Sequence, residues 1–358
     1  MRPVTVRIMH PEAGASAGPL GRWLADERVR IARRHATGFR AAGAADVAVV
    51  AGPPDATSFG ERLRTLVRAD RPAGLVILGS GAVPLATADD LRDLVAAAGA
   101  DDRFALANNR YSADVVAIAG AWPVLDDLPD LPSDNALPRW LAEVTGYSVA
   151  DLRRRWRLAV DIDGPLDLVL IGSADVAAPV DLGPVRASIA AVRSVAADRT
   201  MELIVSGRTS AATVGWLERM TPSRTRALIE ERGLRTATAG QRPPASVLAT
   251  LIERDGPEAF GAILAGFGDA AIVDTRVLMA ARSGRDEAAW PAAEDRYASD
   301  LLLPEGIEDP WLRALTASAA GAPIPILLGG HTLVGPGLRL ALGRGVRDSR
   351  SARGGRWT

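Results

Sequence analysis

Short apolar runs alternate with longer amphipathic segments along most of this chain, and that alternation constrains the fold more than any other feature. Apolar runs at 4–9, 46–52 and 74–81 have the composition of buried β-strands. The segments between them, including 26–44 and the stretch after Thr87, have apolar residues at helical spacing. Thr87 stands at a favourable N-cap position for the second of these helices. The order strand, helix, strand predicts α/β layers around a mainly parallel sheet.

The pattern restarts after residue 168, which predicts a second domain. A strand ending at Asp161 and Asp163 closes the first half, and further strands are expected at 168–173, 201–207, 270–275 and 324–330. Two short strands around a polar turn are expected at 104–120, and one long helix at 245–268. We therefore predict an α/β protein with two doubly wound, mostly parallel-sheet domains at 1–168 and 169–345, followed by a flexible tail at 346–358.

The charge of the chain favours a small-molecule partner. The net charge is −1 over 358 residues, so the chain lacks the excess of basic residues that proteins binding nucleic acid or anionic membranes usually have. No apolar stretch is long enough for a signal peptide or a membrane span, so we expect a cytoplasmic protein. The chain has no cysteine and no lysine, which excludes thiolate chemistry, Schiff bases and a P-loop lysine. A homo-oligomer is compatible with the sequence.

Polar residues directly after the strands of the first half are the candidate binding groups, because ligands of open α/β sheets gather beyond the carboxyl ends of the strands. They are Ser80, Gly81, Asn108, Asn109, Arg110, Asp114, Asp134, Asn135, Asp161 and Asp163. Carboxylate oxygens suit Mg²⁺, which takes one or two carboxylates together with substrate phosphates. The same residue types also form turns and helix caps, and each of these residues has that alternative role.

The second half offers two weaker candidates. Arg208, Thr209 and Ser210 follow a strand and precede a helix, where backbone N–H groups could hold a phosphate. The alternative, which the missing lysine and P-loop spacing favour, is a plain βα turn with a Thr or Ser cap. His331 follows a strand in a glycine-rich turn. The charges between 274 and 300 have the spacing of salt-bridged surface residues.

Four stretches in the first half resemble the nucleotidyltransferases of GT-A fold. They are VPLATADDLRDLV (83–95), AWPVL (121–125), LPRWLAEVTGYSV (137–149) and VDIDGPLDLVL (160–170). The molybdenum-cofactor guanylyltransferases and the phospholactate guanylyltransferases are the most similar groups. The resemblance covers residues 1 to about 168, and implies a Rossmann-like GT-A domain in which Asp161 or Asp163 helps bind the metal that bridges a nucleoside triphosphate.

Two motifs depart from that family. In the family a lysine of the first loop binds the triphosphate, and the loop HPEAGASAGPLGRW (10–23) lacks it. An aspartate directly before Pro-Leu is the family's principal metal ligand, and GSGAVPL (79–85) lacks that aspartate. Three hypotheses therefore stand. The first is an enzyme that transfers a nucleotidyl group from a nucleoside triphosphate to a phosphorylated small molecule, with Mg²⁺ on Asp161 and Asp163. The second is a nucleotide-binding or scaffold protein that has lost activity, and the third places activity on a phosphorylated small molecule in the C-terminal domain.

The transferase hypothesis gives each candidate a role. Arg110, together with the 10–22 loop, would neutralise phosphates, and Asp114 is the first candidate for a further metal-bridging carboxylate. Base, sugar or acceptor recognition would fall to Asn108, Asn109, Asp134 and Asn135.

Overall fold

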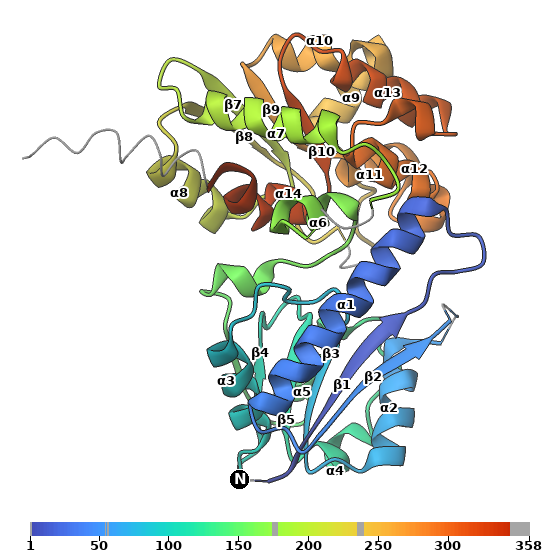
Figure 1. Ribbon diagram of the computed structural model, residues 1–358, viewed down its shortest axis with the longest axis vertical. Coiled ribbons are helices and arrows are strands. Elements are labelled where there is room, and N and C mark those ends of the chain that lie inside the picture. The colour runs from blue at the N-terminus through green and yellow to red at the C-terminus, as the bar shows by residue number, and fades with distance from the viewer. Residues whose placement is uncertain (1, 54, 56, 174–177, 235–239, 344–358) are drawn as a thin grey trace, which may run out of the picture. The chain divides into compact units, whose positions relative to one another are not determined.

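The computed structural model describes residues 2–53, 55, 57–173, 178–234 and 240–343 (Figure 1). The chain divides into two compact units. Unit 1 comprises Met1–Ala17 and Leu24–Ile162, and unit 2 comprises Gly18–Trp23 and Asp163–Thr358. The expected boundary at 168 falls inside a helix of unit 2, and the expected tail at 346–358 lies outside the described residues.

Unit 1 is built on a mixed six-stranded sheet in the order β2-β1-β3-β5-β4-β6. Its strands are β1 (Val4–Pro11), β2 (Asp46–Gly52), β3 (Gly74–Gly79), β4 (Phe104–Ala107), β5 (Val115–Ala119) and β6 (Ser148–Asp151). Its helices are α1 (Pro19–Ala41), α2 (Phe59–Asp70), α3 (Ala88–Ala98), α4 (Ala121–Leu125) and α5 (Leu137–Glu143), with 3-10 turns η1 (Asp134–Ala136) and η2 (Trp156–Ala159). Strand β5 runs antiparallel to both β3 and β4. The expected pair of short strands around a polar turn is confirmed as β4 and β5.

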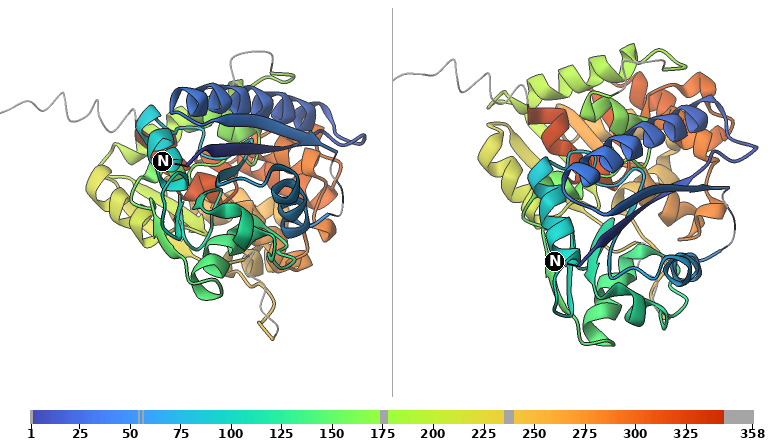
Figure 2. Two further views of the ribbon diagram at one scale, coloured as in Figure 1. Left: turned by 90° about the horizontal axis from the view of Figure 1, so that it is seen from below. Right: turned by 60° about the horizontal axis from the view of Figure 1, so that its bottom comes forward.

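Both faces of this sheet are covered by helices because its central strands are apolar on both sides. Val76 and Leu78 pack into a cluster with residues of α1 and α3, whereas Leu75 and Ile77 pack into a second cluster with α2, α4 and α5. Successive side chains of a strand point to opposite faces, so one continuous apolar run supplies both clusters. In Figure 2 the blue helix α1 and the lighter blue α2 lie on opposite sides of β1 and β2. The expected N-cap is also confirmed, since Thr87 Oγ1 accepts from Asp90 N and Asp90 Oδ2 accepts from Thr87 N.

Unit 2 contains a four-stranded parallel sheet in the order β10-β9-β7-β8. Its strands are β7 (Glu202–Gly207), β8 (Arg224–Ile229), β9 (Ala270–Asp274) and β10 (Ile326–Gly329). Its helices are α6 (Pro165–Ile171), α7 (Gly183–Ala196), α8 (Ala211–Met220), α9 (Val247–Asp255), α10 (Phe260–Ala265), α11 (Thr275–Ser283), α12 (Ala293–Asp300), α13 (Pro310–Ala320) and α14 (His331–Val334). Short 3-10 turns occur at η3 (Pro257–Ala259), η4 (Glu287–Ala289) and η5 (Pro304–Gly306). The prediction of two α/β domains is thus confirmed at the level of fold class.

The sequence prediction is wrong in the segment that joins the two units. No strand precedes Asp161 and Asp163. The chain forms η2, then a single bridge between Asp161 and Ala82, and then helix α6 where a strand at 168–173 was expected. Pro165 at the first turn and Asp167, whose carboxylate accepts from the N–H groups of Asp163 and Gly164, start a helix here.

The helix expected at 245–268 is also interrupted. Gly256 adopts φ +87 and Pro257 follows it, so α9 ends at this point and the chain resumes as η3 and α10. The two helices still bury one apolar face, because Leu248, Ile252, Phe260 and Leu264 belong to the same core cluster.

Candidate functional site

Unit 1 has a pocket at the edge of its sheet where the connections from two neighbouring strands, β1 and β3, lead in opposite directions. From β1 the chain leads to β2 on one side, and from β3 it leads towards the β5 side, so the carboxyl ends of β1 and β3 flank a topological switch point. A pocket of about 400 Å³ lies there, with more apolar than polar lining. Its polar members include His10, Asp55, Arg62, Asp114 and Asp134. Two of the residues predicted from strand ends, Asp114 and Asp134, therefore line one cavity.

A buried histidine and serine join the two strands at this switch point. His10 Nδ1 and Ser80 Oγ are 3.0 Å apart and share a hydrogen bond. Burial, assisted by the charge of Arg28, lowers the pKa of His10. Gly81 lies close to the backbone of Ile162, the last residue of unit 1. A Cβ at position 81 would lie 2.9 Å from the Ile162 carbonyl oxygen, so a glycine fits here best. Ser80 thus holds a pocket residue, His10, whereas Gly81 packs beside Ile162, and neither Ser80 nor Gly81 lines the pocket itself.

The turn between β4 and β5 is braced by Asn108. Its Nδ2 donates to Asp114 Oδ2 at 2.7 Å and to the Leu158 carbonyl at 2.8 Å, and its Oδ1 accepts from Asp114 N at 2.9 Å. Asn109 Oδ1 accepts from Tyr111 N, which is the hydrogen bond of an Asx turn. These contacts hold the Asp114 carboxylate at the pocket.

The remaining candidates of this region are held near the same turn. Asn135 Oδ1 accepts from Ser112 Oγ at 2.9 Å, which links the turn to η1. Arg110 is half-buried in the turn and is not among the residues that line the pocket. The binding and catalytic roles assigned to these residues stay predictions.

Asp161 and Asp163 have different partners. Asp161 Oδ1 accepts from Ile162 N and lies in unit 1, beside Gly81. Asp163 lies in unit 2, where its Oδ2 is 3.4 Å from His331 Nδ1. Among the described residues, no group of three or more His, Asp or Glu side chains could hold a metal ion by itself. A Mg²⁺ site would therefore need ligands from the substrate, as is usual for this ion.

Unit 2 has its own switch point, between the carboxyl ends of β7 and β9. The chain leads from β7 to β8 on one side and from β9 to β10 on the other. Arg208 follows β7 and Asp274 ends β9, and the two form a bidentate ion pair of 2.6 and 3.0 Å. Gly207 allows this approach, since it adopts φ +127 and a Cβ on it would lie 2.3 Å from Asp274 Cβ.

The phosphate-binding turn expected after β7 is occupied by contacts within the protein. Thr209 is fully buried and its Oγ1 donates to the Val334 carbonyl at 2.5 Å. Ser210 caps helix α8 by accepting from Thr213 N at 3.1 Å. Arg208 is held by Asp274, so the geometry agrees with the alternative role as a capped βα turn.

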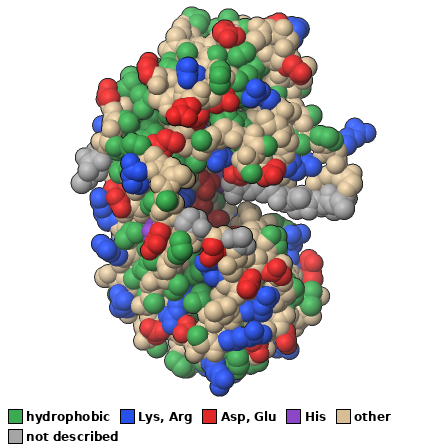
Figure 3. Space-filling model, turned by 90° about the vertical axis from the view of Figure 1, so that its right-hand side faces the viewer, with side chains coloured by type: hydrophobic (Ala, Val, Ile, Leu, Met, Phe, Trp, Pro, Cys, Tyr) green, Lys and Arg blue, Asp and Glu red, His purple; other side chains and the backbone are tan. Residues whose placement is uncertain are grey.

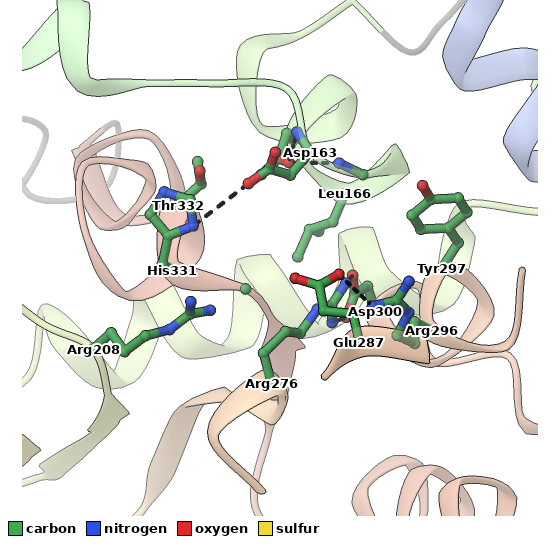
Figure 4. A pocket seen from close by; sticks show the side chains of 13 residues that line it. Asp163, Leu166, Arg208, Arg276, Glu287, Arg296, Tyr297, Asp300, His331 and Thr332 are labelled. Carbon is green, nitrogen blue, oxygen red and sulfur yellow. Dashed lines mark hydrogen bonds and ion pairs between the residues drawn. The ribbon is translucent and has the colours of Figure 1, made fainter. Parts of the chain in front are cut away.

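A polar cavity of about 100 Å³ lies at this second switch point (Figure 4). In the figure the Asp163–His331 pair lies on one side of the cavity, and Glu287 and Arg296 face each other across a dashed contact of 3.1 Å. His331, which sequence analysis selected, lines it together with Thr332.

At the base of this cavity, buried charged groups have pKa values shifted from their ordinary values. Arg276 and Asp300 form a bidentate pair of 2.5 and 2.6 Å, and the Asp300 carboxylate outweighs the effect of burial and raises the pKa of Arg276. Burial, reinforced by the negative charge of Asp163, raises the pKa of Asp167 well above its ordinary value. Clusters of perturbed groups in a cavity mark candidate functional sites.

The charges expected on the surface between 274 and 300 are in large part buried. Arg276 and Asp300 are paired as predicted but form the cavity base, and Asp274 pairs with Arg208. Asp295 is also buried, where it accepts from the N–H groups of Glu308 and Asp309. The prediction of surface positions is wrong for these residues. For Asp274 the position at the end of the apolar β9 run was a signal that sequence analysis could have used, whereas no local signal identifies the Arg276–Asp300 pair.

The outer surface shows no grouping of charge by sign on the face in Figure 3, where acidic and basic side chains are mixed. Within the described ranges, no helix has the length and apolar character needed to cross a membrane. No family model matches the chain, and no curated protein is similar to it.

Proposed function

We propose that the protein is a nucleotidyltransferase-like enzyme whose unit 1, as a GT-A-type domain, binds a nucleoside triphosphate in the switch-point pocket. The observation that carries this proposal is the position of the pocket of about 400 Å³ at the carboxyl ends of β1 and β3. Nucleotides bind at this place in open α/β sheets. The apolar lining suits a base and sugar, and the resemblance of residues 1 to about 168 to GT-A nucleotidyltransferases supports the same ligand.

The reaction would be attack of an acceptor phosphate oxygen on the α-phosphorus, with departure of pyrophosphate. Asp114 and Asp134, two of the three carboxylates that line the pocket, would hold Mg²⁺ together with the triphosphate. The ion would neutralise charge on the phosphates. Asn108 would position Asp114 through its bonds of 2.7 and 2.9 Å.

Nucleotide binding without transfer is the second candidate, because the chain lacks the lysine and the aspartate of the family motifs. The first turn of α1 belongs to unit 2, and its backbone N–H groups are occupied there by Glu294. The Glu294 carboxylate accepts from Leu20 N at 2.7 Å and from Gly21 N at 3.0 Å. A phosphate would have to displace this carboxylate.

A thermal-shift panel of GTP, CTP, UTP and ATP, with and without Mg²⁺, tests the proposal. Binding at a hundred times Kd stabilises the folded state by about 2.7 kcal/mol, which raises Tm by roughly 5–10 °C in a domain of this size. We expect a Mg²⁺-dependent rise with one nucleotide and its loss in the Asp114→Asn variant, with the exposed Asp101→Asn as matched control.

Turnover separates the two candidates. Release of pyrophosphate in the presence of phosphorylated acceptors supports transfer, whereas a Mg²⁺-dependent shift without release supports binding alone. The absence of a shift with all four nucleotides would refute both.

A further inference from the structure

We propose that the cavity of unit 2 is a second small-molecule site, and that it takes a small uncharged polyhydroxylated ligand, such as a three-carbon polyol or the equivalent part of a sugar. This site is separate from the nucleotide pocket of unit 1. It lies at the switch point between β7 and β9, where the carboxyl ends of parallel strands present loops to a ligand.

The arginines that line the cavity already form ion pairs with carboxylates of the protein, so an uncharged ligand fits the cavity better than an ionic one. Every arginine that lines the cavity has a carboxylate within 3.1 Å. The pairs are Arg208 with Asp274, Arg276 with Asp300, and Arg296 with Glu287. An anion or cation would have to break one of these pairs, and an uncompensated buried charge costs several kcal/mol.

A neutral ligand with several hydroxyl groups uses this lining without breaking a pair. Each hydroxyl donates one hydrogen bond and accepts others, so it can bridge a carboxylate oxygen and a guanidinium N–H that already face each other. Asp167, whose pKa is raised by burial, adds a further hydrogen-bonding carboxyl group to the lining. The lining is therefore complementary to a polyol and not to phosphate.

The size of the cavity limits the ligand. An apolar cavity of 150 Å³ holds one benzene molecule, which has six non-hydrogen atoms, so about 100 Å³ encloses roughly four such atoms. A whole nucleotide does not fit. Glycerol matches the density of hydrogen-bonding groups, and its six non-hydrogen atoms would extend from the enclosed volume to the half-exposed Asp163 and His331.

Asp163 and His331 lie at the solvent-exposed end of the cavity, where a ligand enters. Their side chains are 37% and 42% exposed, while Arg276 and Asp300 beneath them are buried, so a ligand reaches these two residues first. The Asp163 carboxylate lies 3.4 Å from His331 Nδ1 at the cavity, so one ligand can contact both side chains (Figure 4).

Histidine side-chain NMR tests the proposal on the intact protein, because the chain has only three histidines. Loss of one imidazole signal in His331→Gln assigns the ring of His331. We expect glycerol to shift that signal saturably, with Kd on the order of 1–10 mM, while the signals of His10 and His35 stay unchanged. Asp163→Asn should weaken the binding at least tenfold, and Asp255→Asn, on an exposed carboxylate of the same unit, should not.

Inorganic phosphate and glycine at matched concentrations distinguish the ligand class. A larger or earlier shift of the His331 signal with either of them would overturn the assignment of an uncharged ligand. A glycerol response that is linear, or that Asp163→Asn leaves unchanged, would overturn the site itself. Neither result depends on nucleotide binding, so this inference and the function of unit 1 fail separately.

Discussion

His35 should make unit 1 sensitive to mild acid. This side chain lies on the inner face of α1, is 2% exposed, and packs edge-on against the ring of Phe39 with centroids 6.5 Å apart. Burial, then the charge of Arg34, lower its pKa from 6.5 to about 4, against a smaller opposing effect from the Val83 backbone. The folded protein therefore keeps this ring neutral at a pH where the unfolded chain protonates it.

The sign and the size of the effect follow from linkage. The folded-state pKa is depressed, so the stability is fully present above pH 6.5 and is lost as the pH falls towards 4. At about 1.4 kcal/mol per pKa unit, the loss in the free energy of unfolding is roughly 2 kcal/mol between pH 7 and 5, and about 3 kcal/mol by pH 4.

Urea unfolding at intervals between pH 7 and 4 measures this slope. His35→Leu should be less sensitive to pH than the wild type by the amounts given above, whatever its stability at pH 7. Thr37→Leu, on the exposed face of the same helix, is the matched control and should keep the wild-type slope. Equal slopes for wild type and His35→Leu would show that the ring is not held neutral in the folded state.

Three further predictions concern packing and buried charge. Asp90→Ala removes the capping box of α3 and the partner of two arginines, and should lower the free energy of unfolding by about 3 kcal/mol in urea titrations; the exposed Asp89→Ala should change it by less than about 0.5 kcal/mol. Arg276→Met leaves Asp300 buried without its partner and should cost about 3–5 kcal/mol, and adding Asp300→Leu should restore most of the loss, which calorimetry can follow. Gly207→Ala should cost more than about 2 kcal/mol through the clash with the neighbouring strand end and the positive φ, and a wild-type Tm for this variant would contradict the turn geometry.

The sequence predicts the sheets well because their strands are buried on both faces. The runs at β3 and β9 are apolar at consecutive positions and end in small or polar residues, so their identity does not depend on distant contacts. The apolar run at 168–173 has a similar composition but lies mostly within α6 (Pro165–Ile171). Periodicity does not separate a short buried helix from a strand, and here the capping residues decided the outcome.

The candidate site is predictable only in part, for a similar reason. Asp114 reaches the pocket of unit 1 because it lies between the end of β4 and the start of β5, at one edge of the sheet. Asp134 reaches it from η1, a turn that no strand end precedes directly. Arg276 and Asp300 could not be placed in a cavity from sequence, because their pairing depends on α11 and α12 packing together. Local sequence shows which charges exist, and tertiary contacts decide which of them are buried.

Unit 2 is formed by two segments that are separated in the sequence, which limits how this protein can be divided or recombined. Its Gly18–Trp23 segment precedes most of unit 1 in the chain, and two backbone N–H groups of that segment depend on Glu294, far downstream. A fragment that stops at residue 162 would lose this carboxylate and leave the start of α1 without its partner. The two units are therefore not interchangeable modules, and gene fusion or domain exchange at residue 162 alone would transfer an incomplete unit.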